Sequence, residues 1–489
     1  KSRSTRRVPA PSLLTMDANE FRANGQAVIG LIAQYLETIE QRPVTADVRP
    51  GDIRSMLPEH PPTSPESFDD VLRDVNNIVL PGLTHWQHPH FYAFFPGNSS
   101  YPSILADLLT AGLGVQGMSW LSSPACTEVE TLMLDWMQEL LGLPDKFRST
   151  TATGGGVIQG SASEATLSSI LAARWRTTQG HVNRDGDTSK LIAYCTSQSH
   201  SSIEKGLRIA GIGTQNIRVI EHDQSFAMNA DALEAQIIVD KNAGLIPFWI
   251  CSTHGTTSSG AFDPTPAIGL IAQRHELWLH VDAAMHGIAA LAPEFRWVND
   301  GLELADSYCT NPHKWMGTIL DCSLLYVRDV EILVRVLSTN PSYLRAASDG
   351  EVTQFKDWGI PLGRRFRSLK LWFHLRLAGA ESIRARLRRD RANAQWLAGQ
   401  VAGEPDPGGA GLAVPQQRVS GRPQRTHVCD HAAPHQTAGR WLRLAHRRLH
   451  TAQPRRVLPG QPARRLWPHR GAARPQQSRR ARCPRRPGA

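Results

Sequence analysis

Residues 154–165 read GGGVIQGSASEA and run into a segment of helical pattern, residues 166–174. A glycine-rich turn that feeds a helix start exposes backbone N–H groups and the positive end of the helix dipole, and this arrangement suits a phosphate group. The hydroxyls of Ser161 and Ser163 can add further donors. Taken alone, such a turn is also a common structural device, because glycine turns and serine caps precede many helices.

The segments around this turn alternate between strand-like and helical patterns, from about Pro81 to Gly379. Strand-like apolar segments cover residues 191–195, 217–220, 245–251, 277–281 and 323–327. Such alternation predicts an α/β fold, with a sheet that is covered by helices. In sheets of this kind, active sites collect at the carboxyl ends of the strands.

The chain before this region has a different pattern. Residues 16–80 show helical spacing of apolar residues, for example at Val28, Ile32 and Leu36, and predict a small helical arm. We expect the chain to divide into a leader without assigned fold (residues 1–15), the helical arm (16–80) and a large α/β domain (81–380). The start of a small C-terminal domain (381–400) and a basic tail (401–489) follow.

A carboxylate ends one of the expected strands, since residues 277–282 read LWLHVD. Burial of Asp282 is costly unless the carboxylate meets a cation. A helix N-cap is one explanation for an aspartate at this place. The functional explanation is a salt bridge to a protonated pyridine nitrogen, which would keep the ring cationic and able to accept electrons.

Lys314 follows in an unusual setting for a lysine, within the sequence NPHKW of residues 311–315. Partial burial would lower its pKa and favour the neutral amine that Schiff-base formation requires. A lone lysine is nearly always a solvated charge. Its order after the glycine-rich turn and Asp282 is what favours a catalytic role.

Six motifs follow one another in order along the chain. They are GGGVIQGSASEA, SQSHSSIEK, STHGTTSSGAFD, WLHVDAA, NPHKW and PLGRRFRSLKLWF. The series resembles the group II pyridoxal-phosphate-dependent decarboxylases, in particular aromatic-L-amino-acid decarboxylase, over about residues 16–390. The resemblance implies fold type I, a mixed and mostly parallel sheet covered by helices, and a homodimer. It also implies pyridoxal 5'-phosphate as cofactor and decarboxylation of a dopa-, tyrosine-, tryptophan- or phenylalanine-type substrate to the amine and carbon dioxide.

The matching motifs imply catalytic roles for four residues. Lys314 corresponds to the Schiff-base lysine, and Asp282 to the partner of the pyridine nitrogen. His200 corresponds to the histidine that stacks on the cofactor ring and helps to position the substrate carboxylate. Tyr343 corresponds to a tyrosine on a mobile lid that protonates the reacting carbon after carbon dioxide leaves. His200 as a hydrogen-bonded loop residue and Tyr343 as an exposed loop tyrosine are the alternatives.

Further positions match the cofactor site and the substrate pocket. The positions that match phosphate-binding residues of the family are Ala162, Ser163, Asn311 and His313. The positions that match residues in contact with the cofactor ring are Thr257 and Ala284. Trp86, Phe94 and Phe95 match the aromatic wall of the substrate pocket, although composition alone would place them in the core. No cluster suggests a metal site.

Some positions that border the substrate in this family depart from its animal members. They are Gly97, Asn98, Gln116, Met118, Met285 and His286. The preferred aromatic substrate is therefore open. Glutamate is disfavoured, because the wall offers aromatic rings rather than a cation for a second carboxylate. An aromatic aldehyde synthase is the nearest rival, and the presence of both His200 and Tyr343 opposes it.

The basic charge of the chain lies in its tail. Residues 401–489 contain 18 arginines, no lysine and three acidic residues, a net charge of +15, which leaves −5 for residues 1–400 of the total of +10. The tail also has no Ile, Phe, Tyr, Met or Asn, and such a composition cannot build an apolar face. It favours a frameshift near residue 400 over a natural RNA-binding tail, so we expect no nucleic-acid partner. A frameshifted chain that cannot assemble or act is a further alternative.

The cysteines and the hydropathy pattern indicate the compartment. Seven cysteines are scattered, odd in number and never in a CxxC pair, which argues against a disulfide framework and a zinc site. No run approaches the roughly 18 apolar residues of a membrane-spanning helix. We expect a cytoplasmic enzyme that has no membrane segment.

Overall fold

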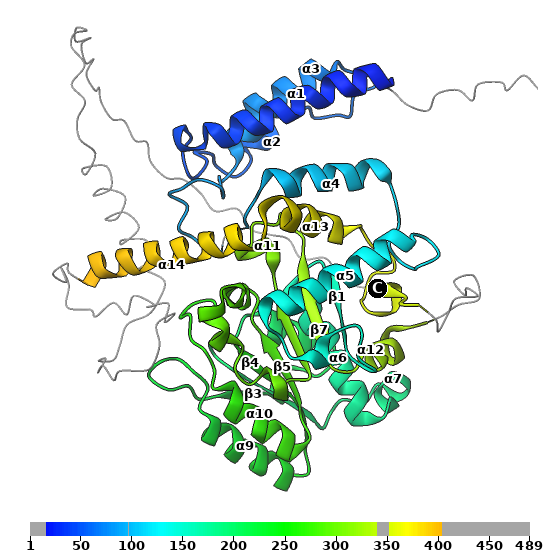
Figure 1. Ribbon diagram of the computed structural model, residues 1–489, viewed down its shortest axis with the longest axis vertical. Helices are drawn as coiled ribbons and strands as arrows, with labels where there is room; N and C mark the ends of the chain where they lie inside the picture. The colour runs from blue at the N-terminus through cyan, green and yellow to red at the C-terminus, as the bar shows by residue number, and fades with distance from the viewer. Residues whose placement is uncertain (1–15, 96, 340–351, 403–489) are drawn as a thin grey trace, which may run out of the picture. The chain divides into compact units, whose positions relative to one another are not determined.

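The computed structural model describes residues 16–95, 97–339 and 352–402. Three predictions therefore lie outside the described residues: the leader of residues 1–15, the role of Tyr343, and the tail from residue 403 onward. Figure 1 shows the described chain as a set of N-terminal helices followed by a sheet that is covered by helices.

The N-terminal segment is helical throughout its regular parts. Its elements are α1 (Ala18–Glu37), η1 (Ile39–Gln41), α2 (Asp52–Met56), α3 (Phe68–Asp74), η2 (Val75–Val79) and η3 (Leu80–Gly82). Helix α1 begins at a capping box, in which the Asp17 carboxylate accepts from the N–H of Glu20 while the Glu20 carboxylate accepts from the N–H of Asp17. No side chain of α1 is fully buried, and Leu31, Ile32 and Leu36 are half-buried, so packing within the described chain covers only part of its apolar face.

Seven strands form one sheet. They are β1 (Gly155–Gln159), β2 (Leu191–Thr196), β3 (Ile217–Ile220), β4 (Ile246–Thr253), β5 (Trp278–Asp282), β6 (Ser307–Thr310) and β7 (Ser323–Val327). Their order across the sheet is β1-β7-β6-β5-β4-β2-β3. Strand β7 is antiparallel to both β1 and β6, and the other pairs are parallel. The predicted α/β fold with a mostly parallel sheet is confirmed.

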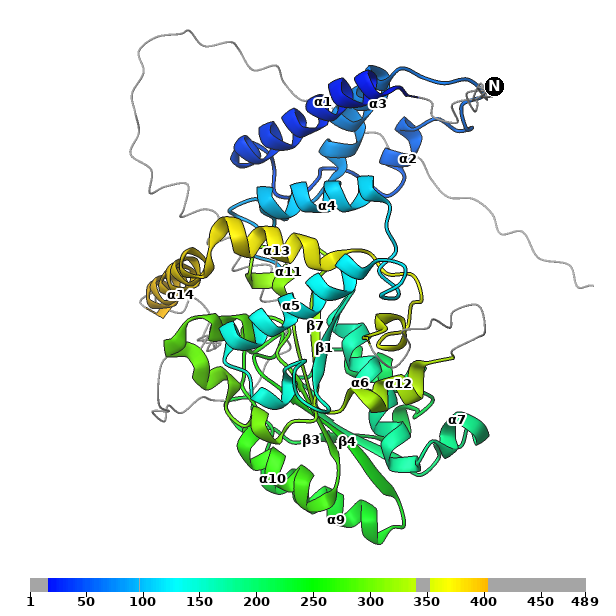
Figure 2. The ribbon, with the colours of Figure 1, turned by 45° about the vertical axis from the view of Figure 1, so that its right-hand side comes forward.

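Helices connect and cover the strands, as the two views in Figures 1 and 2 show. They are α4 (Tyr101–Leu113), α5 (Pro124–Leu141), α6 (Ala162–Thr178), α7 (His181–Asp185), α8 (Ser202–Ile209), α9 (Ala230–Asn242), α10 (Thr265–His275), α11 (Pro312–Trp315), α12 (Val330–Leu337), α13 (Arg367–Ala378) and α14 (Ala380–Ala402). Helix α6 packs against β4, β5, β6 and β7, which places its first turn beside the central strands. Helix α14 reaches Ala402, the last residue that the structure describes.

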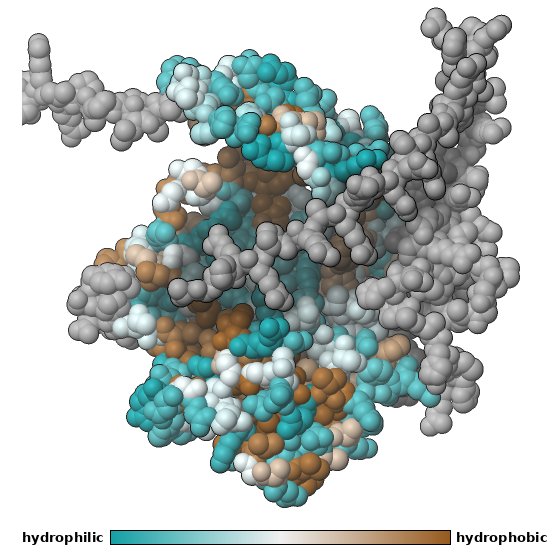
Figure 3. All heavy atoms as spheres, turned by 180° about the vertical axis from the view of Figure 1, so that it is seen from behind, coloured by the Kyte–Doolittle hydropathy of each residue, from teal (hydrophilic) through white to brown (hydrophobic). Residues whose placement is uncertain are grey.

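The surface of the described chain also carries apolar side chains, which Figure 3 shows in brown. On α4 they are Tyr101, Leu105, Leu108, Leu109 and Leu113, each between 44% and 55% exposed. A contiguous apolar patch of this kind on a helix is typical of a face that another surface covers.

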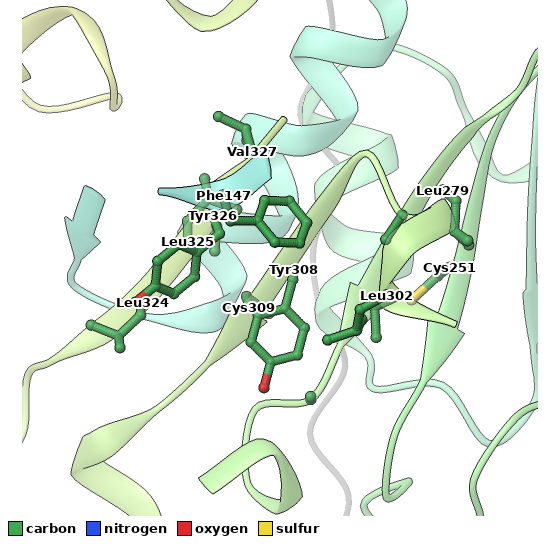
Figure 4. Packing of buried hydrophobic residues seen from close by; sticks show 14 of the residues in the cluster. Phe147, Cys251, Leu279, Leu302, Tyr308, Cys309, Leu324, Leu325, Tyr326 and Val327 are labelled. Carbon is green, nitrogen blue, oxygen red and sulfur yellow. The ribbon is translucent and has the colours of Figure 1, made fainter. Parts of the chain in front are cut away.

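The core lies along the sheet. All five residues of β5 are buried, and the indole rings of Trp249 and Trp278 are fully buried on adjacent strands. Figure 4 shows Tyr326 of β7 between Phe147 and Tyr308 of β6, with ring centres 6.1 Å and 6.4 Å from its own, and all three side chains are 0% exposed. Burial of one such large side chain contributes roughly 1.5–3 kcal/mol, so the central strands are held firmly and can position groups at their ends.

One buried ion pair ties the start of the sheet to the chain before α13. The Arg364 guanidinium donates to Glu130 Oε1 at 2.6 Å and to the carbonyl of Ile158 at 2.8 Å. Glu130 Oε1 also accepts from the N–H of Ile158 at 2.8 Å, and both charged side chains are at most 5% exposed. The pair therefore fixes β1, which leads into the glycine-rich turn, against α5.

Replacement of Arg364 by Met should destabilise the protein by about 3–5 kcal/mol, because it leaves the Glu130 carboxylate buried without a cation. Urea unfolding followed by tryptophan fluorescence measures the change. The matched control is Arg335→Met, which breaks an exposed pair with Glu331 on α12 and should cost about 0.5 kcal/mol or less. Equal shifts of the unfolding midpoint in the two variants would contradict the structural role of Arg364.

Candidate functional site

The predicted site residues follow strands that end at one edge of the sheet. His200 follows β2, Thr257 follows β4, Asp282 ends β5 and Lys314 follows β6, and these four strands are parallel. Strand β1 runs in the same direction as β6, because both are antiparallel to β7. The turn at residues 160–161 therefore lies at the same edge, where ligands of open α/β sheets bind.

Asp282 is 5% exposed at the end of a fully buried strand. Its Oδ1 accepts from the N–H of Ala284 at 3.0 Å and lies 3.7 Å from Cys309 Sγ. Among the described residues, no salt bridge joins this carboxylate to a cation. Because a buried carboxylate is costly without a cationic partner, Asp282 is suited to a ligand that brings a positive charge.

Lys314 lies in α11, directly after β6. Burial lowers the pKa of its amine, and the Asp282 carboxylate, followed by Cys309, opposes that shift. The Nζ atom is 5.2 Å from the centre of the Phe95 ring. The backbone around the lysine is held by Asn98, whose side-chain amide donates to the Lys314 carbonyl and whose N–H donates to the carbonyl of His313. A lysine of lowered pKa is a better nucleophile at neutral pH.

The glycine-rich motif of residues 154–165 is not a turn over its whole length: Gly155–Gln159 form β1, and the turn into α6 lies at Gly160 and Ser161. Ser161 caps the helix by accepting from the N–H of Glu164 at 3.3 Å, and the Glu164 carboxylate accepts from the N–H of Gly160 at 2.9 Å. A Cβ atom on Gly160 would lie 3.2 Å from Glu164 Oε2, so glycine keeps this turn narrow. Ala162 and Ser163, both half-buried, form the first turn of the helix, where backbone N–H groups are free to bind an anion.

Asn311 and His313 are two further donors on the α11 segment, and both are buried. The Asn311 side-chain oxygen accepts from Ser323 Oγ at 2.7 Å, so its amide N–H groups are the part available to a ligand. His313 Nδ1 accepts from the N–H of Cys322 at 2.9 Å. Burial lowers the pKa of His313 to about 4, so the ring is neutral and its proton lies on Nε2. Both side chains can thus donate to a phosphate.

His200 and Thr257 are exposed in loops that contact each other through neighbouring residues. Ser259 Oγ donates to Gln198 Oε1 at 2.9 Å and joins the loop after β4 to the loop after β2. His200 Nδ1 accepts from the N–H of Ser202 at 3.2 Å, which fixes the ring at the start of α8. No hydrogen bond within the described chain joins either side chain to Lys314, so their roles stay predictions.

Two of the three predicted wall residues, Trp86 and Phe94, lie outside the core, whereas Phe95 packs against it. Trp86 and Phe94 stack with ring centres 5.6 Å apart and an interplanar angle of 11°. They are 42% and 78% exposed, and Phe94 has a backbone φ of 59°, a strained value for a bulky residue. Phe95 is half-buried and meets Lys314. The exposed, stacked rings of Trp86 and Phe94 are typical of a binding surface rather than a core.

Neighbours of Asp282 that no motif singles out also belong to the site. His280 and Cys309 lie on β5 and β6, are fully buried, and form a hydrogen-bonded row that reaches the carboxylate. The alternation of side chains along β5 places His280 and Asp282 on the same face, and this is the signal in the sequence that points to His280.

His286, one of the departures from the family, fills the space beside Lys314. It is fully buried, and its ring meets Phe95 edge-on at 5.8 Å. Gly255 has a φ of 84°, and a Cβ atom there would lie 2.0 Å from His286 Nδ1. Glycine at position 255 is therefore required by both the backbone and the imidazole.

Comparison with known proteins adds independent information. The family model described as the pyridoxal-dependent decarboxylase conserved domain matches residues 50–406. Tyrosine decarboxylase 2 of Narcissus pseudonarcissus is 46% identical over 395 residues, which cover 80% of this chain and 77% of the relative. Phenylacetaldehyde synthase of Arabidopsis thaliana is 47% identical over 380 residues, 77% of each chain. The crystal structure of Oryza sativa TDC with PLP and tryptamine has a TM-score of 0.78 at 40% identity and covers 80% of this chain and 81% of its own.

The residues at this edge of the sheet fit pyridoxal 5'-phosphate. The aldehyde of that group requires an amine, its pyridine nitrogen a carboxylate, and its phosphate a set of N–H and O–H donors. Lys314 would provide the amine and Asp282 the carboxylate. The start of α6 with Ser163, together with Asn311 and His313, would provide the donors.

The described part of the chain has neither a candidate membrane span nor a candidate metal site. None of its helices is both long and apolar enough to cross a bilayer. Within the same residues, no group of three or more His, Cys, Asp or Glu side chains is arranged to hold a metal ion.

The lowered pKa of Lys314 predicts how its reactivity depends on pH. In cofactor-free protein, modification of the neutral amine by trinitrobenzenesulfonate, read by peptide mass spectrometry, should have its midpoint below pH 10.5, because burial disfavours the charged form. The Asp282 carboxylate favours that form, so Asp282→Asn should move the midpoint to a still lower pH. The exposed Lys205 on α8 serves as internal control and should react alike in both proteins. An upward shift in the variant would refute the electrostatic coupling.

Proposed function

The chain belongs to the pyridoxal-dependent decarboxylase family and is a carboxy-lyase that uses pyridoxal phosphate, and we propose that its substrate is an aromatic L-amino acid of dopa, tyrosine, tryptophan or phenylalanine type. The products are the corresponding amine and carbon dioxide. The observation that carries this proposal is the aromatic segment: Trp86 stacks on Phe94, and the next residue in the chain, Phe95, contacts Lys314.

The residues of the site divide the chemistry among them. Bound pyridoxal phosphate supplies an electron-accepting ring to the carbon–carbon bond that breaks. Lys314 supplies an amine whose pKa is lowered by burial, so that it can bind the aldehyde. Asp282 holds positive charge on the ring nitrogen, and the donors at the start of α6 hold the phosphate. His200 is proposed to cover the ring and to orient the substrate carboxylate.

The aromatic wall supports an aromatic rather than an acidic substrate. Within the described chain, the cation that contacts the rings of Trp86, Phe94 and Phe95 is Lys314 itself, whose Nζ lies 5.2 Å from the centre of the Phe95 ring. A second carboxylate on the substrate would need a further cation to replace its lost hydration. An aromatic side chain instead gains stacking of about 0.5–1.5 kcal/mol in addition to its area burial.

An aromatic aldehyde synthase is the second candidate, because the Arabidopsis phenylacetaldehyde synthase is as similar to this chain as the Narcissus tyrosine decarboxylase is. The sequence carries both His200 and Tyr343, the residues that such synthases typically replace. Tyr343 lies outside the described residues, so its role as proton donor to the reacting carbon stays a prediction. The two candidates differ in product and are therefore separated by one assay.

The cytoplasm is the proposed location. The cysteines of the described chain are free, buried thiols: Cys126, Cys195, Cys251, Cys309 and Cys322. A set of unpaired cysteines is typical of proteins in reducing compartments.

Incubation with dopa, tyrosine, tryptophan and phenylalanine should release carbon dioxide and the matching amine from at least one of them, and glutamate should not react. Chromatography of the products, with assays for ammonia and peroxide, distinguishes the amine from the aldehyde. Phe94→Ala should raise the KM for the preferred substrate by roughly two- to tenfold through lost stacking. Phe226→Ala, at an exposed phenylalanine with a similar backbone (φ 63°), is the control and should leave KM unchanged. Mainly aldehyde from the parent would favour the synthase.

A homodimer is also part of the proposal, and the apolar face of α4 supports it. Leu105, Leu108 and Leu109 follow one another at helical spacing and are 46%, 51% and 44% exposed. Such a stripe in an aqueous protein favours burial against a second apolar face. A second copy of the chain supplies an identical stripe, and isologous pairing of one patch is the commonest route to a dimer.

Replacement of Leu105 and Leu109 together by Asp should convert the dimer into a monomer, because two carboxylates would have to be desolvated in the interface. Sedimentation velocity measures the mass. The control is Leu270→Asp at an equally exposed leucine of α10, which should leave the assembly intact. A parent that sediments as a monomer would overturn the proposed assembly.

A further inference from the structure

A row of polar side chains lies behind Asp282. Alternate residues of a strand point to the same face, so Trp278, His280 and Asp282 of β5 share one face. The register pairs His280 with Ser307 and Asp282 with Cys309 on β6, which places these two side chains on that face as well. Figure 4 shows Cys309 among the central strands, and all five side chains are at most 5% exposed.

Hydrogen bonds connect the row from end to end. The indole N–H of Trp278 donates to Ser307 Oγ at 2.8 Å, and Ser307 Oγ lies 2.9 Å from His280 Nδ1. His280 Nε2 lies 3.8 Å from Cys309 Sγ, and Cys309 Sγ lies 3.7 Å from Asp282 Oδ1. The two sulfur contacts are at distances that suit a thiol.

The chemistry of the end groups sets the direction of the row. An indole can only donate and a carboxylate can only accept. Burial lowers the pKa of His280 to about 4, so the ring carries one proton, and burial raises the pKa of the Cys309 thiol well above its ordinary value, so the thiol keeps its proton. Each proton is used once if Ser307 donates to Nδ1 of His280, Nε2–H donates to Cys309, and the thiol donates to Asp282.

The reverse direction would turn the thiol proton toward His280. Asp282 Oδ1 would then retain the N–H of Ala284 as its donor and lose the thiol, which is unfavourable for a carboxylate that is 5% exposed. The arrangement in which each group donates to the next one toward Asp282 therefore satisfies more of the buried polar groups.

We propose that Cys309 and His280 are positioning residues for Asp282. They hold Oδ1 with donors from the protein and so leave Oδ2 to face the cationic ring nitrogen of the cofactor. Neither side chain touches the cofactor or the substrate in this scheme. The inference rests on the role given to Asp282 in the proposed function, and it adds a residue, Cys309, that acts through that aspartate.

The test measures cofactor binding rather than turnover. Protein stripped of cofactor is titrated with pyridoxal phosphate, and the dissociation constant is read from tryptophan fluorescence, together with the visible absorbance of the bound form as a function of pH. Cys309→Ala should raise the dissociation constant about tenfold, the lower end of what loss of a supporting hydrogen bond costs at a ligand site, and should shift the pH midpoint of the absorbance change. Cys309→Ser restores a donor and should stay within about twofold of the parent.

The matched control is Cys195→Ala on β2, which removes another buried thiol of the same sheet, 6% exposed against 0% for Cys309, for which the described chain shows no hydrogen bond to Asp282. It should leave both the dissociation constant and the pH midpoint unchanged. Equal losses in Cys309→Ala and Cys195→Ala would overturn the proposal, because they would report general packing.

A second arm examines His280. His280→Gln retains an N–H donor and should lose less affinity than His280→Leu. In Cys309→Ala, the change from His280 to Leu should have a smaller effect than in the parent, because the two residues act through one row. Independent, additive effects would overturn the row. A parent that binds no pyridoxal phosphate would refute the proposed function, whereas a parent that binds it and is indifferent to Cys309→Ala refutes this inference alone.

Discussion

The burial of one carboxylate that forms no salt bridge within the described residues is the constraint on which the site depends. Asp282 ends a strand that is buried over its whole length, and its described hydrogen bonds come from the backbone of Ala284 and the thiol of Cys309. These neutral donors reduce the cost of desolvation but supply no opposing charge. A carboxylate so placed is suited to a cationic ligand, and the proposed ligand is the ring nitrogen of pyridoxal phosphate. The same burial also acts on Lys314. It lowers the pKa of the lysine by favouring the neutral amine, and the Asp282 carboxylate opposes this shift by favouring the charged form.

The sheet converts this local constraint into a complete site. Parallel strands bring residues that are far apart in sequence to one edge, and the antiparallel β7 allows β1 to deliver the start of α6 to the same edge. The buried pair of Arg364 and Glu130 fixes β1 and therefore the glycine-rich turn that follows it. Anion-binding donors, carboxylate and amine are thus held by the rigid core, whereas Trp86 and Phe94 are exposed beside it. This division is typical of enzymes that hold a cofactor rigidly and vary the substrate surface.

The fold and the polar centre of the site are predictable from the sequence, because apolar strands, a glycine-rich turn and a carboxylate at a strand end each carry a local signal. Strands β1 and β6 are harder to predict, since GGVIQ and SYCT contain small or polar residues and lack a continuous apolar run. Exposure of Phe94 is not predictable from composition, because an aromatic residue is more often buried. The link between Cys309 and Asp282 requires the register of two strands, which the sequence does not specify. His200 and Thr257 stay predictions, as their described contacts hold the loops and do not reach Lys314.

The measurement that tests this account most directly is the position of the covalent cofactor label. The parent protein, loaded with pyridoxal phosphate and reduced with borohydride, is digested and analysed by peptide mass spectrometry. The account predicts that the reduced label lies on Lys314, and that Lys314→Ala removes it while Lys205→Ala, at an exposed lysine of α8, does not. A label on any other lysine of the parent, or a label that persists in full in Lys314→Ala, would contradict the assignment of the site.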